Sequence, residues 1–177
     1  MNFTQTQNPD WGESSYWIWR GFRCHWRVIG PAENHPMLLL HGFGASSEHW
    51  RNNVHYFVAS GFRVYGLDLV GFGASDQPGW NKSLPLDNGF WGRQVNDFLE
   101  QVVDVKRTGK AVLIGNSLGG LIALTTAVVR KDLVSAFVAA PLPDPTLLNP
   151  IRTNPPKFLK AIKNIIVTFA FTVFPIE

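Results

Sequence analysis

The chain has 177 residues and a formal net charge of +3, and it is 45% hydrophobic, 13% aromatic and 16% charged. This composition argues against disorder, and the length suits one domain with a sizeable core. Because no basic block is interleaved with aromatic residues, nucleic acid is not expected as a partner. Cys24 is the sole cysteine, which excludes a disulfide framework and a cysteine-based metal site. We expect Cys24 to be reduced and buried in a strand.

Neither end of the sequence has the pattern of a secretory signal or a membrane span. Residues 1–15 are polar, without a basic segment followed by an apolar one. Near the other end, "IIVTFAFTVFPI" is shorter than the roughly 20 apolar residues that cross a bilayer. We therefore expect a cytoplasmic protein without a transmembrane span, and a plastid or thylakoid-associated location stays open as an alternative.

The first half of the chain predicts strands followed by a helix. "YWIWRGFRCHWRVIG" indicates two strands around a turn at Arg20–Gly21. The continuously apolar run 37–41 is typical of a strand buried on both faces of a sheet. Ser46 or Ser47 then offers an N-cap for a helix that Gly61 ends. That helix carries apolar residues at helical spacing: Trp50, Val54, Phe57 and Val58.

The second half alternates strands and helices. Residues 62–68, 111–116 and 133–140 indicate strands, and "LGGLIALTTAVVR" indicates a helix that is apolar on all sides and therefore buried. Another helix, ending near Gly109, has an apolar face marked by Trp91, Val95, Phe98 and Val102. This alternation predicts an α/β fold with a mostly parallel sheet and helices on both faces. After residue 140 the proline content rises, which indicates a separate excursion.

Gly115-Asn116-Ser117-Leu118-Gly119 fits the pattern G-x-S-x-G between a predicted strand and a predicted helix. In this setting a sharp turn holds the serine in a strained backbone conformation, and Gly115 and Gly119 let neighbouring backbone pass closely. The hydroxyl then stands beside the positive end of a helix dipole. Ser117 is therefore the candidate nucleophile, and the alternative is a glycine-rich packing turn with an inert serine.

The segment "HGFGAS" follows the first core strand and is the candidate oxyanion loop. Acyl transfer needs two backbone N–H donors aimed at the developing oxyanion, and we expect them from Leu118 and Phe43. Gly42 and Gly44 allow the loop geometry that points the amide inward. For His41 we expect a structural role, in which the ring holds the loop by hydrogen bonds.

Two acidic residues and several aromatic ones lie near these loops. In "DLVGFGASD", we expect Asp68 and Asp76 to fix the loop through hydrogen bonds to backbone amides, not to act as the catalytic acid. The aromatic residues are either the walls of an apolar substrate pocket or ordinary core: Phe43, Trp50, Phe72 and Trp80.

The segments "HGFGAS…HW", "DLVGFGASD" and "GNSLGG" occur in this order and together resemble the α/β-hydrolase superfamily over roughly residues 17–145. Within it, "WIWRG", "HGFGASSEHWR" and "VYGLDLVGFGASD" are most similar to the plant and cyanobacterial branch that includes pheophytinase. Enzymes of that branch cleave a long-chain ester from a chlorophyll-type pigment. The chain then divides into a polar N-terminal tail (1–16), the N-terminal part of the hydrolase core (17–143) and the start of a cap (144–177).

The resemblance implies a serine hydrolase for a small-molecule carboxylic ester, with Ser117 as nucleophile and without a metal or cofactor. In the family the acid and then the histidine follow the nucleophile, yet no histidine follows Ser117 in this sequence. We therefore expect the chain to be a hydrolase fragment that is inactive by itself. A carbon–carbon bond hydrolase and a catalytically silent binding protein are the alternatives. Epoxide and haloalkane hydrolases are disfavoured because they carry an aspartate in place of Ser117.

The predicted sheet also bears on partners. A sheet of this kind continues past 133–140, so we expect that strand to form an apolar edge with unpaired backbone groups, which invites association. The segment 157–174 is expected to fold back over this edge, and peripheral contact with a lipid surface is the alternative. The oligomeric state is left open.

Overall fold

The computed structural model describes residues 11–79, 86–140 and 174–175. The strands are β1 (Glu13–Trp19), β2 (Phe22–Ile29), β3 (His35–Leu40), β4 (Phe62–Leu67), β5 (Ala111–Asn116), β6 (Val134–Ala140) and β7 (Phe174–Pro175). The helices are the 3-10 helix η1 (Ser47–Trp50) and α1 (Val54–Ala59), α2 (Asn88–Gln101), α3 (Val105–Thr108) and α4 (Leu118–Val129). From β3 to β6, strands alternate with helices as the sequence predicts.

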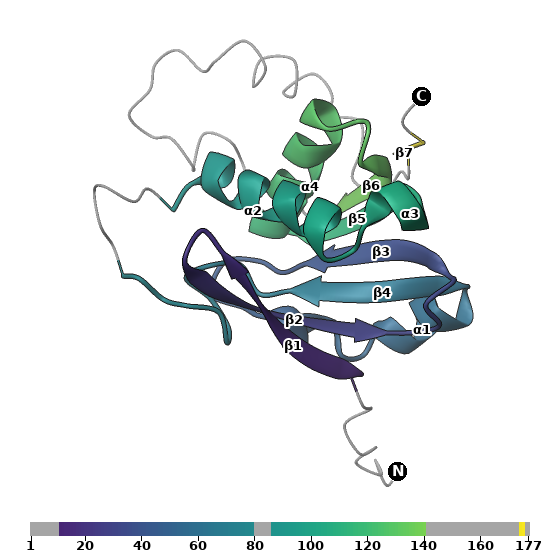
Figure 1. Cartoon of the computed structure of the whole chain (residues 1–177), viewed down its shortest axis with the longest axis horizontal. Helices are drawn as coiled ribbons and strands as arrows, with labels where there is room; N and C mark the ends of the chain where they lie inside the picture. The colour runs from purple at the N-terminus through teal and green to yellow at the C-terminus, as the bar shows by residue number, and fades with distance from the viewer. Residues whose placement is uncertain (1–10, 80–85, 141–173, 176–177) are drawn as a thin grey trace, which may run out of the picture.

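The strands form one sheet in the order β1-β2-β4-β3-β5-β6-β7 (Figure 1). The strands β4, β3, β5 and β6 are parallel to one another, whereas β1, β2 and β7 pair antiparallel. The chain leaves β3 for β4 on one side and later returns to β5 on the other side. Ligands of such sheets bind beyond the carboxyl ends of the strands where the strand order reverses. The loop after β3 and the turn after β5 meet at this place.

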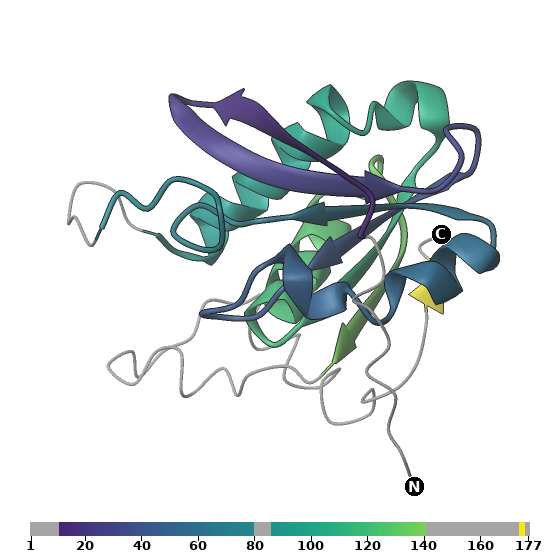
Figure 2. The ribbon, with the colours of Figure 1, turned by 90° about the horizontal axis from the view of Figure 1, so that it is seen from below.

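Helices cover both faces of the sheet (Figures 1 and 2): α2 and α4 lie on one face, and η1 and α1 lie on the other. The position of β3 between these two layers of helices explains why its residues 37–40 are all apolar. Leu38 and Leu40 belong to the core cluster beneath α2 and α4, whereas Met37 and Leu39 belong to the cluster beneath η1 and α1. The expected α/β fold, with a mostly parallel sheet and helices on both faces, is confirmed.

Two predicted helices are interrupted. The helix expected after Ser46 is split into η1 and the short α1, and the Ser46 side chain makes no capping hydrogen bond. The helix expected to run through Val102 stops with α2 and resumes as α3, because Asp104 adopts a left-handed φ of 56° between them. Gly109, at φ 93°, ends α3 as expected. α4 is buried over most of its length, but Val129 at its end is 67% exposed.

Two predicted boundaries also change. The strand β1 begins at Glu13, inside the tail expected for 1–16, because residues 13–16 pair with β2. The sequence predicts an open edge at 133–140, but Ala136 and Phe137 pair with β7, so that prediction is wrong at these two residues. The remainder of the cap region, including 157–173, lies outside the described residues.

The expectation for Cys24 agrees with the structure. Cys24 is fully buried in β2, and burial raises the pKa of its thiol to about 12, so the thiol stays protonated. Among the described residues, no helix has the length and apolar content that crossing a membrane requires.

Candidate active site

Ser117 lies at the turn between β5 and α4. Its φ of 52° and ψ of −113° are a conformation that residues with a side chain rarely adopt, so the backbone is strained here. The Ser117 backbone amide and the Asn116 side-chain amide hold the turn to β6, because the Ser117 N–H and the Asn116 Nδ2 atom both donate to the Ala140 carbonyl oxygen, at 3.3 and 3.1 Å. The Leu121 N–H donates to the Ser117 carbonyl oxygen at 3.1 Å. The half-buried serine side chain makes no capping hydrogen bond to the helix, which leaves its hydroxyl available for chemistry.

The two glycines of the motif are required by close packing. A Cβ atom on Gly115 would collide with the carbonyl group of Gly119. A Cβ atom on Gly119 would collide with the carbonyl oxygens of Leu40 and His41 at the end of β3. The strand, the helix and the loop after β3 therefore meet at the serine turn with no room for side chains.

The loop after β3 lies directly against this turn. β3 and β5 are neighbours, with Leu40 opposite Gly115. A Cβ atom on Gly42 would lie 3.0 Å from the Asn116 Oδ1 atom and 3.4 Å from the Ser117 Cβ atom. The glycine thus allows the loop to approach the serine to van der Waals distance.

Phe43 and Leu118 bring two backbone amides to this contact. Leu118 is the first residue of α4, and Phe43 follows Gly42 in the loop. Within the described ranges, neither amide nitrogen donates to a backbone oxygen. Gly44 has a φ of 70°, a conformation that favours glycine, and it turns the chain directly after Phe43. The two residues expected to stabilise an oxyanion thus lie in the two segments that meet here, and neither amide has a described backbone acceptor.

His41 is fully buried, and both of its ring nitrogens are engaged. Nε2 accepts a hydrogen bond from the Leu69 amide at 3.1 Å, so the proton is on Nδ1, which donates to the Gly42 carbonyl oxygen at 2.8 Å. Burial lowers the pKa of His41 below its usual value of 6.5, which keeps the ring neutral. This geometry supports a structural role, because no ring nitrogen is left to take a proton from Ser117.

Asp68 follows β4, is buried, and fastens several segments together. It accepts hydrogen bonds from the His25 Nδ1 atom at 2.9 Å, the Ser47 amide at 2.6 Å and the Ala74 amide at 2.9 Å. Burial alone raises the pKa of Asp68, but the hydrogen bonds from His25 and the two amides outweigh it and lower the pKa to about 2. Asp76 accepts one hydrogen bond, at 2.8 Å, from a backbone amide of β2. Both carboxylates thus bind backbone amides, as the sequence predicts.

The other histidines are engaged elsewhere or belong to other elements. The His25 Nδ1 atom is held by Asp68. His35 begins β3, at the end of the strand opposite to the loop, and the His49 ring meets the ring of its neighbour Trp50 edge to face in η1. His55 lies on α1, which covers the other face of the sheet. In the part of the chain that the structure describes, no histidine nitrogen hydrogen-bonds to Ser117.

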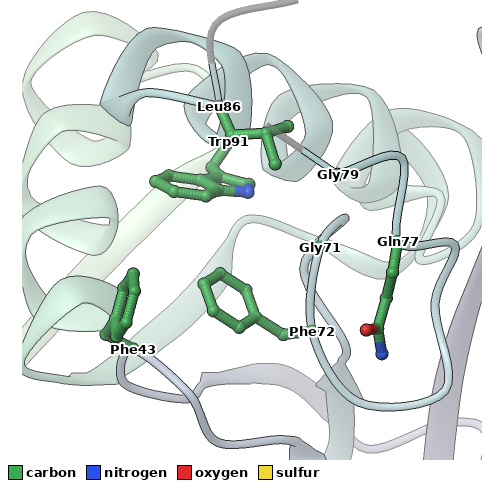
Figure 3. A pocket seen from close by; sticks show the side chains of 7 residues that line it. All are labelled: Phe43, Gly71, Phe72, Gln77, Gly79, Leu86 and Trp91. Carbon is green, nitrogen blue, oxygen red and sulfur yellow. The ribbon is translucent and has the colours of Figure 1, made fainter. Parts of the chain in front are cut away.

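A cavity of about 250 Å³ opens beside the loop after β3 (Figure 3). Its lining residues are Phe43, Gly71, Phe72, Gln77, Gly79, Leu86 and Trp91. The ring of Phe72 lies between the other two aromatic rings, with centroids 5.2 Å from Phe43 and 5.7 Å from Trp91. The Trp91 indole N–H donates to the Val70 carbonyl oxygen at 2.9 Å, which fixes that ring. The cavity wall is therefore a row of aromatic rings that begins at the candidate oxyanion loop.

The aromatic residues near the loops separate into two groups. Phe43 and Phe72 line the cavity, whereas Trp50 packs in the core cluster beneath η1 and α1. Trp80 lies outside the described residues. The sequence did not single out Trp91 or Leu86 as cavity residues, since their apolar character is equally typical of a helix face. The described residues contain no cluster of three histidine, cysteine or acidic side chains that could hold a metal ion.

Comparisons with known proteins agree with this geometry. A family model for the alpha/beta hydrolase fold matches residues 35–163. The chain is similar to epoxide hydrolase 4 of Mus musculus, with 34% identity over 72% of this chain and 33% of that protein. It is also similar to the 2-hydroxy-6-oxo-6-(2'-aminophenyl)hexa-2,4-dienoic acid hydrolase of Metapseudomonas resinovorans, with 30% identity over 63% of this chain and 37% of that protein. The chain thus spans about a third of the length of these curated relatives.

A solved structure shows the same fold. The thioesterase domain from the curacin biosynthetic pathway matches with a TM-score of 0.67 and 20% identity, over 89% of this chain and 53% of that domain. The narrower resemblance to the pheophytinase branch stays a prediction. The family match over residues 35–163, together with the serine turn and the loop after β3, shows that the chain belongs to the α/β-hydrolase fold family.

Proposed function

We propose that this chain carries the nucleophile and the oxyanion hole of a serine hydrolase that acts on carboxylic esters. The observation that carries the proposal is the strained backbone of Ser117, at φ 52°, directly against the loop after β3. A serine in a packing turn has no need of such a conformation, whereas a nucleophile must project its hydroxyl beyond the end of the sheet. The narrower form of this proposal is that the substrate is an ester of a chlorophyll-type pigment, as for enzymes of the pheophytinase branch.

In the proposed reaction, the Ser117 hydroxyl attacks the ester carbonyl carbon and loses its proton to a general base. The Phe43 and Leu118 amides donate hydrogen bonds to the oxyanion that forms. The alcohol then leaves with a proton, and water hydrolyses the acyl-serine to release the acid. The base is not assigned to a described residue, since His41 has both nitrogens engaged. We therefore expect the 177-residue chain by itself to lack the rate of a complete triad.

The similarity to proteins named epoxide hydrolases does not carry their activity to this chain. Family members that open epoxides place an aspartate at the position of Ser117. A carboxylate is already ionised at neutral pH, whereas a serine hydroxyl needs a base to remove its proton before it becomes a good nucleophile. The residue at the turn therefore supports acyl transfer.

A carbon–carbon bond hydrolase is the second candidate. The observation in its favour is the similarity to the dienoic acid hydrolase of Metapseudomonas resinovorans, whose name describes a 6-oxo substrate. Such a reaction would still use Ser117 and the two amides, but the bond that breaks joins carbon to carbon.

The test uses the longest natural protein that contains this chain and compares it with its Ser117→Ala variant. With a p-nitrophenyl ester, the alanine variant should lose at least about 10⁴-fold in kcat/KM, the scale of losing a nucleophile from a serine hydrolase. Its melting temperature should be unchanged, because the serine side chain makes no capping hydrogen bond. Hydrolysis at an unchanged rate in a folded alanine variant would contradict the nucleophile assignment.

Two further measurements separate the alternatives. Cleavage of a 2-hydroxy-6-oxo-dienoic acid in preference to the p-nitrophenyl ester would favour the carbon–carbon hydrolase. Turnover of the ester by the 177-residue chain at ordinary hydrolase rates, abolished by Ser117→Ala, would show that an upstream residue serves as the base.

A further inference from the structure

The aromatic cavity begins at the residue that is proposed to hold the oxyanion. The Phe43 amide lies next to Gly42, which contacts the serine turn, while the Phe43 side chain lines the cavity. A carbonyl group held by this amide would thus have one of its two substituents at the mouth of the cavity. Phe43 is 67% exposed, so its ring forms a rim that a ligand can cover.

The cavity is limited in size. At about 250 Å³ it exceeds the ~150 Å³ of a cavity that takes up one benzene molecule, and it is below the roughly 300 Å³ at which pockets for drug-sized ligands begin. It therefore holds a group of one ring with a short extension. This size favours the general ester hydrolase proposal over its narrower pigment form, because a large macrocycle would have to lie outside the cavity.

The walls favour a ring over a flexible chain. The planes of Phe43 and Phe72 are inclined by 72°, and the ring of Trp91 is fixed by its hydrogen bond to Val70. A flat aromatic group can meet such rings edge to face, which adds about 0.5–1.5 kcal/mol to the burial of apolar area. An alkyl chain gains only the burial and loses more conformational entropy when it is held. Leu86 completes the apolar wall (Figure 3).

We infer that the substrate carries a compact aromatic group on one side of its scissile carbonyl, and that the cavity lined by Phe43, Phe72, Leu86 and Trp91 binds this group. The inference rests on the proposed hydrolase function for its relation to the carbonyl. The cavity is a specificity site, and its residues take no part in breaking the bond.

The test uses two ketones that cannot be hydrolysed, acetophenone and 2-octanone, which contain the same number of non-hydrogen atoms. Saturation-transfer NMR titration of the 177-residue chain gives a dissociation constant for each ketone without any need for catalysis. Acetophenone should bind between about twofold and tenfold more tightly, which is the free energy of an aromatic pair expressed as a ratio. The measurement needs no hydrolysis, so failure of the ester hydrolase proposal would not by itself change the result.

Variants locate the site. Phe72→Leu keeps an apolar side chain but removes the central ring, and it should abolish the preference for acetophenone. Leu86→Trp should fill the cavity and weaken the binding of both ketones. Circular dichroism checks that each variant is folded. Tyr56→Leu removes an exposed ring from α1, on the other face of the sheet, and should change neither constant. Equal binding of the two ketones, binding of neither, or a preference that survives both cavity variants would overturn the inference.

Discussion

At the scale of single residues, Ser117 combines a functional position with an unfavourable backbone conformation. A residue with a side chain at positive φ costs about 1–3 kcal/mol, whereas glycine adopts this conformation freely. We therefore expect Ser117→Gly to raise the free energy of unfolding by about 1 kcal/mol, after the roughly 0.5–1 kcal/mol entropic cost of a glycine is subtracted. Urea unfolding of the 177-residue chain measures this change, and the same substitution should abolish any serine-dependent hydrolysis.

Two controls make that prediction specific. Ser117→Ala keeps the Cβ atom and should leave the free energy of unfolding unchanged. Arg20 also has a positive φ, of 49°, in the turn between β1 and β2, so Arg20→Gly should relieve strain without touching the candidate site. A Ser117→Gly variant less stable than the unaltered chain would show that the serine turn is not strained.

The sequence predicted Ser117, Phe43 and His41 because each is marked by a local motif. The serine and its glycines lie within five consecutive residues, and the loop glycines flank Phe43 directly. Asn116, which ties the serine turn to β6, was not singled out, because its partner Ala140 lies 24 residues away at the end of another strand. A hydrogen bond between distant segments leaves no spacing pattern in the sequence.

At the scale of elements, the buried pair of His25 and Asp68 shows the same limit. The antiparallel register of β2 and β4 pairs Trp26 with Leu67, and continuing it by one position places His25 opposite Asp68. No sequence pattern predicts that His25 and Asp68 are partners, because their pairing depends on which strands are neighbours in the sheet. The apolar strands, in contrast, were predictable, because β3 is buried on both faces and its composition records that burial. The break at Asp104 was not, since the helical apolar pattern continues across it.

The hydrogen bonds of Asp68 make stability depend on pH. Its pKa of about 2 in the folded chain lies below its ordinary value of 3.8, so the carboxylate contributes stability above about pH 4 and loses it as the pH falls toward 2. The difference corresponds to about 2 kcal/mol. Urea unfolding should therefore show that the advantage of the unaltered chain over Asp68→Asn shrinks by about this amount between pH 5 and pH 2.

Comparison within the same loop sharpens this test. Asp76→Asn should cost less stability than Asp68→Asn, because Asp76 is exposed at its position and accepts one side-chain hydrogen bond where Asp68 accepts three. An advantage of the unaltered chain over Asp68→Asn that is equal at pH 5 and pH 2 would contradict the ionised network.

At the scale of the whole molecule, the sheet is covered unevenly. The core strands β3 and β4 have helices on both faces, whereas the six residues after Val134 in β6 are only partly buried. The strand β7 pairs with Ala136 and Phe137 alone, which leaves the carboxyl half of β6 without a described neighbour on that side. Phe137 packs against the cluster beneath α2 and α4, and Val138 therefore points to the opposite face.

An apolar strand that is paired along only part of its length is a template for another chain. We expect the 177-residue chain to self-associate at tens of micromolar, with sedimentation coefficients in analytical ultracentrifugation that rise with concentration. Val138→Lys places a charge at the half-buried edge and should shift the chain toward a monomer, as charged residues do on natural sheet edges. Val129→Lys makes the same change at an exposed position on α4 and should leave the association unchanged. A cooperatively unfolding monomer at these concentrations, or equal effects of the two lysines, would show that β6 is not the surface through which the chain associates.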